Sequence, residues 1–303
     1  SLLFNPILMK VQGLLDRAIK EGIDLDPELI EEFKTHCGEA LVKQLSRGRG
    51  KYSLRMSGLG RPMCQQWHDK NESPKEIQYN SIMRFLFGDI VEAIAMVVLK
   101  SSGVNVESEQ ERVNLDLGVC NLEGTLDVVI DGKVWDIKSA SPYAFSKKFG
   151  GEFGGYNKVK EDDTFGYLMQ GYLYSKAKGM DCGGWIVVDK ASGEWAVCEA
   201  PDYQKDDSDE QLSKAKVNAK QIVKDAPLKK EFKDKEETFR IQYGPRKGDV
   251  VSTGNRVMHT VCSYCDYKLQ CWPNAQMYKR VGTQATQRPL VWYTKLKKRE
   301  VDI

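Results

Sequence analysis

Residues 124–138 read GTLDVVIDGKVWDIK, and this segment decides the fold that we expect. Asp131 and Gly132 stand between two runs of β-branched residues, which is the strongest short-range signal for a two-residue, type I′ hairpin loop. A two-residue loop fixes the register of the hairpin and places Asp127 directly opposite Asp136. We therefore predict two carboxylates on one face of a sheet, with Cβ atoms about 5 Å apart.

The two aspartates suggest a metal site. Lys138 lies two residues beyond Asp136 and points to the same side of the strand. Two like charges in this arrangement repel each other, whereas a divalent cation between them turns the repulsion into binding. Hard carboxylate oxygens suit Mg²⁺ or Mn²⁺. The alternative is a longer turn with a different register, in which both aspartates are solvated.

Two predicted helices carry further polar candidates. Glu92 interrupts the otherwise apolar helix at residues 82–99, and burying a carboxylate without compensation is costly, so it requires a metal or a cation. In the alternative, Asp89 and Glu92 form a thin exposed stripe. In a later helix, at residues 164–178, Gln170 and Tyr174 lie one turn apart on the same face.

The pattern along the chain predicts an α/β protein with a mixed central β-sheet flanked by helices. Two amphipathic helices are expected in residues 6–45, and residues 46–60 are expected to form a loop. The remaining elements are antiparallel strands in 107–138, a hairpin in 184–199, a polar helix in 208–224 and a charged segment with a short strand or helix in 229–254. We expect one compact unit with N-terminal helices and a basic loop (1–80), a core (81–200), and a C-terminal helical or irregular region (201–303).

Composition excludes several classes of protein. The chain has 303 residues, 41% of them hydrophobic and 29% charged, with a net charge of +2, which is typical of a soluble globular protein. No apolar stretch is long enough to span a membrane, and the N-terminus lacks the pattern of a secretory signal. Eight cysteines in such a chain argue against a disulfide framework. We expect an intracellular protein.

Basic residues are concentrated in two places. Six cations and no acid occur between Lys43 and Arg61, and a second basic run, Lys295–Arg299, lies close to the C-terminus. Such patches suit a phosphate backbone, and the alternative is a solvated loop and tail. The candidate phosphate ligands are Arg47, Arg49, Lys51 and Arg55, and the candidate base-stacking residues are Tyr52 and Trp67.

Three cysteines have ligand-type spacing, Cys262-x2-Cys265-x5-Cys271. Three thiolates need a fourth ligand. His259 would complete a Cys₃His zinc site, and Cys64 would complete a set of four thiolates.

The ordered motifs resemble a known family. Gly88-x3-Glu92, Gly124-x2-Asp127, Asp136-x-Lys138 and Gln170-x3-Tyr174 are similar to the motif set of the RecB-like branch of the PD-(D/E)XK nucleases. The resemblance implies a restriction-endonuclease-like core in which Glu92, Asp127 and Asp136 bind the catalytic metal. It also implies that Lys138 positions or activates the attacking water, supported by Gln170 and Tyr174.

The cysteines are similar to those of the iron–sulfur members of that family, which include AddB-type and CRISPR-associated nucleases. The resemblance implies that Cys64, Cys262, Cys265 and Cys271 hold a [4Fe–4S] cluster that joins the N- and C-terminal regions. Zinc is the less favoured occupant.

The resulting hypothesis is a Mg²⁺- or Mn²⁺-dependent exodeoxyribonuclease that acts on single-stranded DNA or DNA ends in recombination, repair or replication. A helicase or recombination protein is an expected partner, because the chain contains no Gly-x4-Gly-Lys-Ser/Thr loop of its own. One alternative is a non-catalytic, zinc-stabilised module that binds single-stranded nucleic acid. The other is an endonuclease or RNA-directed nuclease on the same fold.

Overall fold

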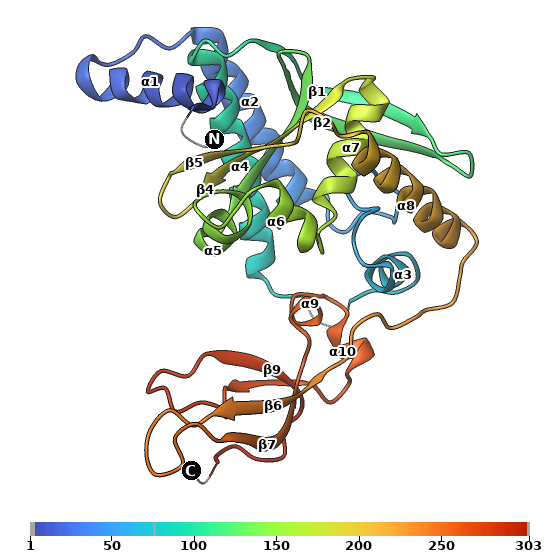
Figure 1. Cartoon of the computed structure of the whole chain (residues 1–303). Helices are drawn as coiled ribbons and strands as arrows, with labels where there is room; N and C mark the ends of the chain where they lie inside the picture. The colour runs from blue at the N-terminus through green and yellow to red at the C-terminus, as the bar shows by residue number, and fades with distance from the viewer. Residues whose placement is uncertain (1–3, 75–76, 302–303) are drawn as a thin grey trace. The chain divides into compact units, whose positions relative to one another are not determined.

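The computed structural model describes residues 4–74 and 77–301, and their contacts group the chain into two compact units (Figure 1). Unit 1 comprises the chain up to Arg61 and Tyr79–Ala226, and unit 2 comprises Pro62–Gln78 and the chain from Pro227 onward. This grouping differs from the three consecutive segments expected from the sequence, because Pro62–Gln78 packs with the C-terminal part of the chain.

Unit 1 is built on a five-stranded mixed sheet of order β1-β2-β3-β4-β5. Its strands are β1 (Val106–Asp116), β2 (Asn121–Ile130), β3 (Lys133–Ala140), β4 (Asp181–Asp189) and β5 (Trp195–Glu199). Neighbouring strands are antiparallel except β3 and β4, which are parallel. A parallel pair needs a long crossover, and the segment between β3 and β4 supplies it. The α/β class and the mixed sheet are as predicted.

Helices surround this sheet. They are α1 (Pro6–Glu21), α2 (Pro27–Leu41), η2 (Val42–Ser46), α4 (Asn80–Ser101), α5 (Pro142–Ala144), η3 (Phe145–Phe149), α6 (Tyr156–Glu161), α7 (Tyr167–Lys178) and α8 (Lys205–Val223), where η marks a π-helix. The prediction of two N-terminal helices is confirmed. Asp26 caps α2, because its side chain accepts a hydrogen bond from the Glu28 backbone N–H at 2.9 Å.

The two faces of the sheet pack against different helices. Trp135 and Ile137 of β3 belong to a buried cluster with Leu99 of α4. Trp185 of β4 belongs to a second cluster with Tyr172 of α7. Because side chains alternate along a strand, Asp136 and Lys138 point to the opposite side of β3 from Trp135 and Ile137.

The β2–β3 hairpin has the predicted register. Ile130 pairs with Lys133, and Val128 pairs with Trp135. The turn residues Asp131 and Gly132 have φ of 48° and 73°, the left-handed conformation that the Asp-Gly pair predicts.

Unit 2 contains a second sheet, of order β6-β7-β9-β8, whose neighbouring strands are antiparallel. Its elements are α3 (Met63–Asn71), β6 (Lys235–Arg240), β7 (Val250–Val257), α9 (Thr260–Ser263), α10 (Lys268–Cys271), β8 (Gln276–Lys279) and β9 (Leu290–Lys295). The short strand or helix expected in 229–254 is present as the strand β6, whereas the rest of this sheet was not expected in a helical or irregular C-terminal region. Residues 205–223 form the predicted polar helix, but they belong to unit 1.

The second sheet escaped prediction because polar residues occupy its interior. Glu237 of β6 is 2% exposed, and its carboxylate accepts hydrogen bonds from Thr253 at 2.7 Å and Tyr293 at 2.7 Å. Asn255 is fully buried beside them. Hydrogen-bonded polar side chains therefore fill inward positions, so the strands lack the apolar alternation that identifies a half-buried strand.

Among the described residues, no helix combines the length and the hydropathy that crossing a membrane requires.

Candidate active site and cysteine site

The carboxylates of Asp127 and Asp136 meet across the β2–β3 hairpin. Asp136 is 4% exposed, and its carboxyl group interacts electrostatically with that of Asp127. Asp127 also accepts a hydrogen bond from the Ile137 backbone N–H at 2.7 Å. The hairpin therefore brings together the two acids that the sequence predicts.

Lys138 lies beside this pair. Its Nζ is 2.8 Å from Asp136 Oδ2 and donates a hydrogen bond to Gln170 Oε1 at 3.3 Å. The same ammonium group lies 5.2 Å from the centre of the Tyr167 ring. The negative charges of Asp136 and Asp127 raise the pKa of Lys138 against the opposing effect of burial. Lys138 is therefore held as a cation at neutral pH.

Glu92 reaches the same site from α4. Burial raises the pKa of its carboxyl to about 7, the Lys138 charge opposes this shift, and the Asp136 charge adds to it. Gly88 of α4 faces Ser139 of β3, and a Cβ at this position would lie 3.4 Å from Ser139 Oγ, which is an ordinary contact distance. Asp89 and Glu92 are both half-buried, which argues against the exposed-stripe alternative.

Gln170 and Tyr174 close the site from α7. A Cβ on Gly124 of β2 would lie 2.5 Å from Tyr174 Cε1, so only glycine allows this ring to pack against the strand. Burial raises the Tyr174 pKa to about 12, while a hydrogen bond with Gln170 acts in the opposite direction. Tyr174 is therefore a neutral phenol at physiological pH.

The assembled site contains three carboxyl groups and one ammonium group. The pKa of Asp127 is raised well above its usual range, first by burial and then by the charges of Asp136 and Glu92, with Lys138 opposing. Three carboxylates share one ammonium group, which is a donor set of hard oxygens that suits a divalent cation. The chemistry of the side chains present thus fits Mg²⁺ or Mn²⁺.

Two residues at this site were missed in the sequence analysis. Tyr167 precedes Gln170 by three residues, so i, i+3 spacing on α7 would have identified it. Lys43 of η2 hydrogen bonds Asp89 Oδ1 at 3.2 Å, and its charge lowers the Glu92 pKa. The basic segment that begins at Lys43 therefore starts at the carboxylate site.

The predicted DNA-binding residues do not all fall in one unit. Arg47, Arg49, Lys51 and Arg55 are exposed in unit 1, and Tyr52 is half-buried there. Trp67 belongs to α3 of unit 2, where its ring packs edge-on against His68 at 5.3 Å. A joint role for Trp67 and the cations stays a prediction.

All four predicted cluster ligands belong to unit 2. Cys64 lies in the first turn of α3, Cys262 in α9 and Cys271 in α10, and Cys265 lies between α9 and α10. Burial raises the pKa of Cys64 to about 12 and that of Cys265 to about 11, and electrostatic interactions link Cys265 to Cys64, Cys262 and Cys271. Two distant segments of the chain thus bring the four thiols into one neighbourhood.

The two histidines near the cysteines differ in their contacts. His259 Nδ1 accepts a hydrogen bond from the Val261 N–H at 3.1 Å and so caps α9. His68, which is 2% exposed, places Nε2 3.4 Å from Cys271 Sγ and Nδ1 3.1 Å from Glu72 Oε2. His68 follows Cys64 by four residues on a helix, a spacing that would have marked it as a candidate.

Neither site is a preformed metal-binding group. Within residues 4–74 and 77–301, no three or more His, Cys, Asp or Glu side chains converge with the geometry needed to hold an ion. The carboxylates are drawn instead into contacts with Lys138 and with each other.

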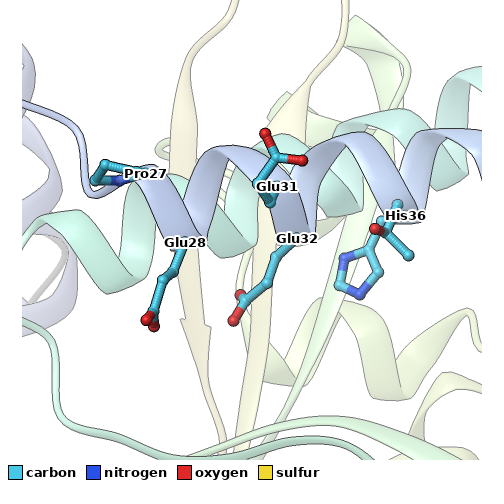
Figure 2. Close-up of a pocket in the computed structure, with 6 residues that line it drawn as sticks. Pro27, Glu28, Glu31, Glu32 and His36 are labelled. Carbon is cyan, nitrogen blue, oxygen red and sulfur yellow. The ribbon is translucent and has the colours of Figure 1, made fainter.

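A pocket lies along α2, and the residues that line it are not among the site residues predicted from the sequence (Figure 2). It is lined by Pro27, Glu28, Glu31, Glu32, Thr35 and His36. Figure 2 shows Glu28, Glu32 and His36 on one side of the helix and Glu31 on the other. Glu32 is ion paired with Lys100 at 2.8 Å. None of the lining residues belongs to the carboxylate site.

Neither a protein-family model nor a curated protein matches the chain. Three chains of solved structures are similar to it, among them the crystal structure of SSO0001. That chain is 15% identical, and the alignment covers 64% of this chain and 86% of SSO0001 with a TM-score of 0.37. This likeness is too distant to assign a fold or a function.

Proposed function

We propose that the protein is a Mg²⁺- or Mn²⁺-dependent DNA exonuclease of the RecB-like PD-(D/E)XK kind, acting on single-stranded DNA or DNA ends in recombination, repair or replication. One observation carries the proposal. Asp127 and Asp136 meet across a tight hairpin, and the Lys138 ammonium group lies 2.8 Å from Asp136. The restriction-endonuclease-like core is part of the same proposal.

Asp127 and Asp136 would hold the cation, with Glu92 as a further ligand from α4. When bound, a divalent cation polarises the scissile phosphate and lowers the pKa of a water molecule. The raised pKa values of Asp127 and Glu92 support this assignment, because their causes are burial first and then repulsion among the carboxylates, and a bound cation would oppose both.

The surroundings of Lys138 favour an electrostatic role over general-base catalysis. The Asp136 and Asp127 charges raise its pKa against the effect of burial, so the side chain is protonated at neutral pH in the metal-free site. An ammonium group beside the carboxylates can instead orient the attacking water and stabilise the negative charge that develops on the phosphate. Gln170 holds Lys138 through a hydrogen bond at 3.3 Å, and Gln170 is itself hydrogen bonded to Tyr174.

We further propose that Cys64, Cys262, Cys265 and Cys271 hold a [4Fe–4S] cluster in unit 2, with zinc as the less favoured occupant. Four soft sulfur donors suit either metal centre. Binding would order two segments that are far apart in the chain, so part of the binding free energy would become folding free energy of unit 2. Free thiols agree with an intracellular location.

Cleavage of an end-labelled single-stranded DNA with Mg²⁺ or Mn²⁺ tests the proposal. Wild-type protein should shorten the strand, and Asp136→Asn should abolish the activity because it removes a ligand charge while preserving shape. Asp131→Asn is the matched control, since Asp131 lies in the turn of the same hairpin and Asn accepts positive φ. Full activity of Asp136→Asn would contradict the proposed site.

Two further substrates separate the rival functions. A circular single strand should resist an exonuclease, so cutting of the circle would indicate an endonuclease. An RNA strand of the same sequence should be cut more slowly than DNA. Binding of single strands without any cleavage would favour the non-catalytic module. Iron and zinc analysis of protein purified without oxygen, with its visible absorbance, distinguishes the cluster from zinc.

A further inference from the structure

The connection between β3 and α7 combines exposed aromatic rings with lysines. Phe153 is 62% exposed and Phe165 is 52% exposed, although burial of such rings would normally stabilise a fold. Adjacent lysines, Lys147 and Lys148, lie on the same connection. We call Lys147, Lys148, Phe153, Phe165 and Tyr167 the aromatic–lysine strip.

Contacts within the strip pair each lysine with a ring. Lys147 Nζ lies 4.4 Å from the centre of the Phe153 ring. Lys148 Nζ lies 5.4 Å from the ring centres of both Phe165 and Tyr167, which stack on each other at 5.6 Å and 22°. Each cation is thus held against an aromatic face, and the rings are held in a defined orientation.

One end of the strip contacts the proposed active site. The Tyr167 ring that stacks on Phe165 also lies 5.2 Å from Lys138 Nζ. A chain of ring and ammonium contacts therefore runs from Lys138 through Tyr167 to Phe165.

The loop that carries Phe153 is tightly packed. A Cβ on Gly154 would lie 2.1 Å from the Gly150 carbonyl oxygen, so the two backbone segments touch. The Gly155 N–H also donates a hydrogen bond to the Lys148 carbonyl at 3.0 Å. A loop held this way presents Phe153 with little conformational entropy left to lose on binding.

Two acidic residues lie close to Lys148 of the strip. Asp162 and Asp163 both act electrostatically on Lys148. The Asp163 carboxylate, however, accepts hydrogen bonds from the backbone N–H groups of Tyr167 at 2.7 Å and Leu168 at 3.0 Å. The charge of Asp163 is therefore partly compensated by the N-terminus of α7.

On the basis of the proposed function, we propose that the aromatic–lysine strip is the track that guides single-stranded DNA to Lys138. Unpaired bases stack on Phe153 and Phe165, and Lys147 and Lys148 contact phosphates. Alternating rings and cations are the features with which proteins bind single strands regardless of sequence. Duplex DNA does not fit this chemistry, because its bases are already stacked on one another.

Binding of a fluorescein-labelled oligothymidylate to the whole 303-residue chain tests the proposal by fluorescence anisotropy. All variants carry Asp136→Asn, so that the probe is not cut. Phe153→Leu and Phe165→Leu keep apolar volume but lose the aromatic face, and each should weaken binding about 5- to 100-fold. Phe165→Trp should retain binding, which excludes a general loss of folding. Tyr203→Leu, which removes a 69% exposed ring elsewhere in unit 1, is the control.

The lysines are tested through their salt dependence. Lys148→Gln should reduce the slope of log affinity against log salt by about 1, whereas Lys190→Gln, on the exposed β4–β5 turn, should not change it. Losses within twofold for both phenylalanine variants would overturn the proposal, and so would equal losses for a blunt duplex.

The test separates this proposal from the nuclease assignment. If binding depends on the rings but the parent protein never cuts DNA, the result would support the single-strand binding role of the strip and contradict the proposed nuclease function. If the parent protein cuts DNA and the ring variants bind it unchanged, the result would support the nuclease function and contradict the binding role of the strip.

Discussion

The two units assemble their candidate sites in different ways. In unit 1, Asp127 and Asp136 are nine residues apart in the sequence, and a two-residue turn sets their geometry. In unit 2, Cys64 comes from one segment of the chain and the other three thiols from a segment far beyond it. A local turn positions side chains without any ligand. In a site made of distant segments, a bound metal that joins the segments also stabilises the fold. We therefore expect changes at the carboxylates to alter activity and changes at the cysteines to alter folding.

The largest expected effect is on unit 2. Cys265→Ser should abolish the cluster, so that iron content and visible absorbance fall to background and unit 2 becomes sensitive to protease. The reason is that the binding free energy of a structural metal centre contributes to folding. Cys120→Ser, at a half-buried thiol in unit 1, is the control. Retention of iron and colour by Cys265→Ser would contradict the assignment.

Lys138→Met should leave unit 1 folded but lower the rate of DNA cleavage about 10²- to 10³-fold, the usual cost of removing a group that stabilises transition-state charge. Rate measurements with saturating substrate would show this as a fall in kcat. Lys133→Met, at the other end of β3 and ion paired with Asp202 at 3.6 Å, is the matched control. An equal loss in both variants would argue against a specific role for Lys138.

Gly124→Ala should destabilise unit 1 by about 1–3 kcal/mol, because the new methyl group meets the Tyr174 ring at 2.5 Å. Denaturant unfolding measures the effect, and Tyr174→Leu in the same chain should restore part of the stability. Gly38→Ala makes a useful contrast, since nothing lies within 4 Å of that position in α2. This change should stabilise by about 0.5–1 kcal/mol. Equal changes in the free energy of unfolding for Gly124→Ala and Gly38→Ala would contradict the proposed contact between Gly124 and Tyr174.

The smallest expected effect concerns Glu92 in metal-free protein. Its folded-state pKa of about 7 exceeds the ordinary value of 4.5, so the folded state keeps a proton that the unfolded state has lost. The carboxyl therefore lowers stability as pH rises from 4.5 to 7, and Glu92→Gln should remove this penalty. We expect a gain of about 1–2 kcal/mol at pH 8 that disappears near pH 4.5. The exposed Glu39→Gln is the control, and a gain independent of pH would contradict the explanation.

The sequence predicted unit 1 well because its signals are local. The Asp-Gly turn determined a register, and the four motifs converge on one site. Unit 2 was harder, since Glu237 and Asn255 fill inward positions of its sheet with hydrogen-bonded polar groups. The contact of His68 with Cys271 joins α3 to α10, and no local pattern encodes such a distant pairing.

The central claim is that Asp127 and Asp136 trap one cation beside Lys138. Binding of Mn²⁺ to metal-stripped protein, followed by electron paramagnetic resonance and by calorimetry, tests it without requiring activity or the cluster. Wild type should bind Mn²⁺ in a site that Asp127→Asn and Asp136→Asn each eliminate, whereas Asp131→Asn leaves it intact. Undiminished binding in the Asp127 and Asp136 variants would contradict the claim.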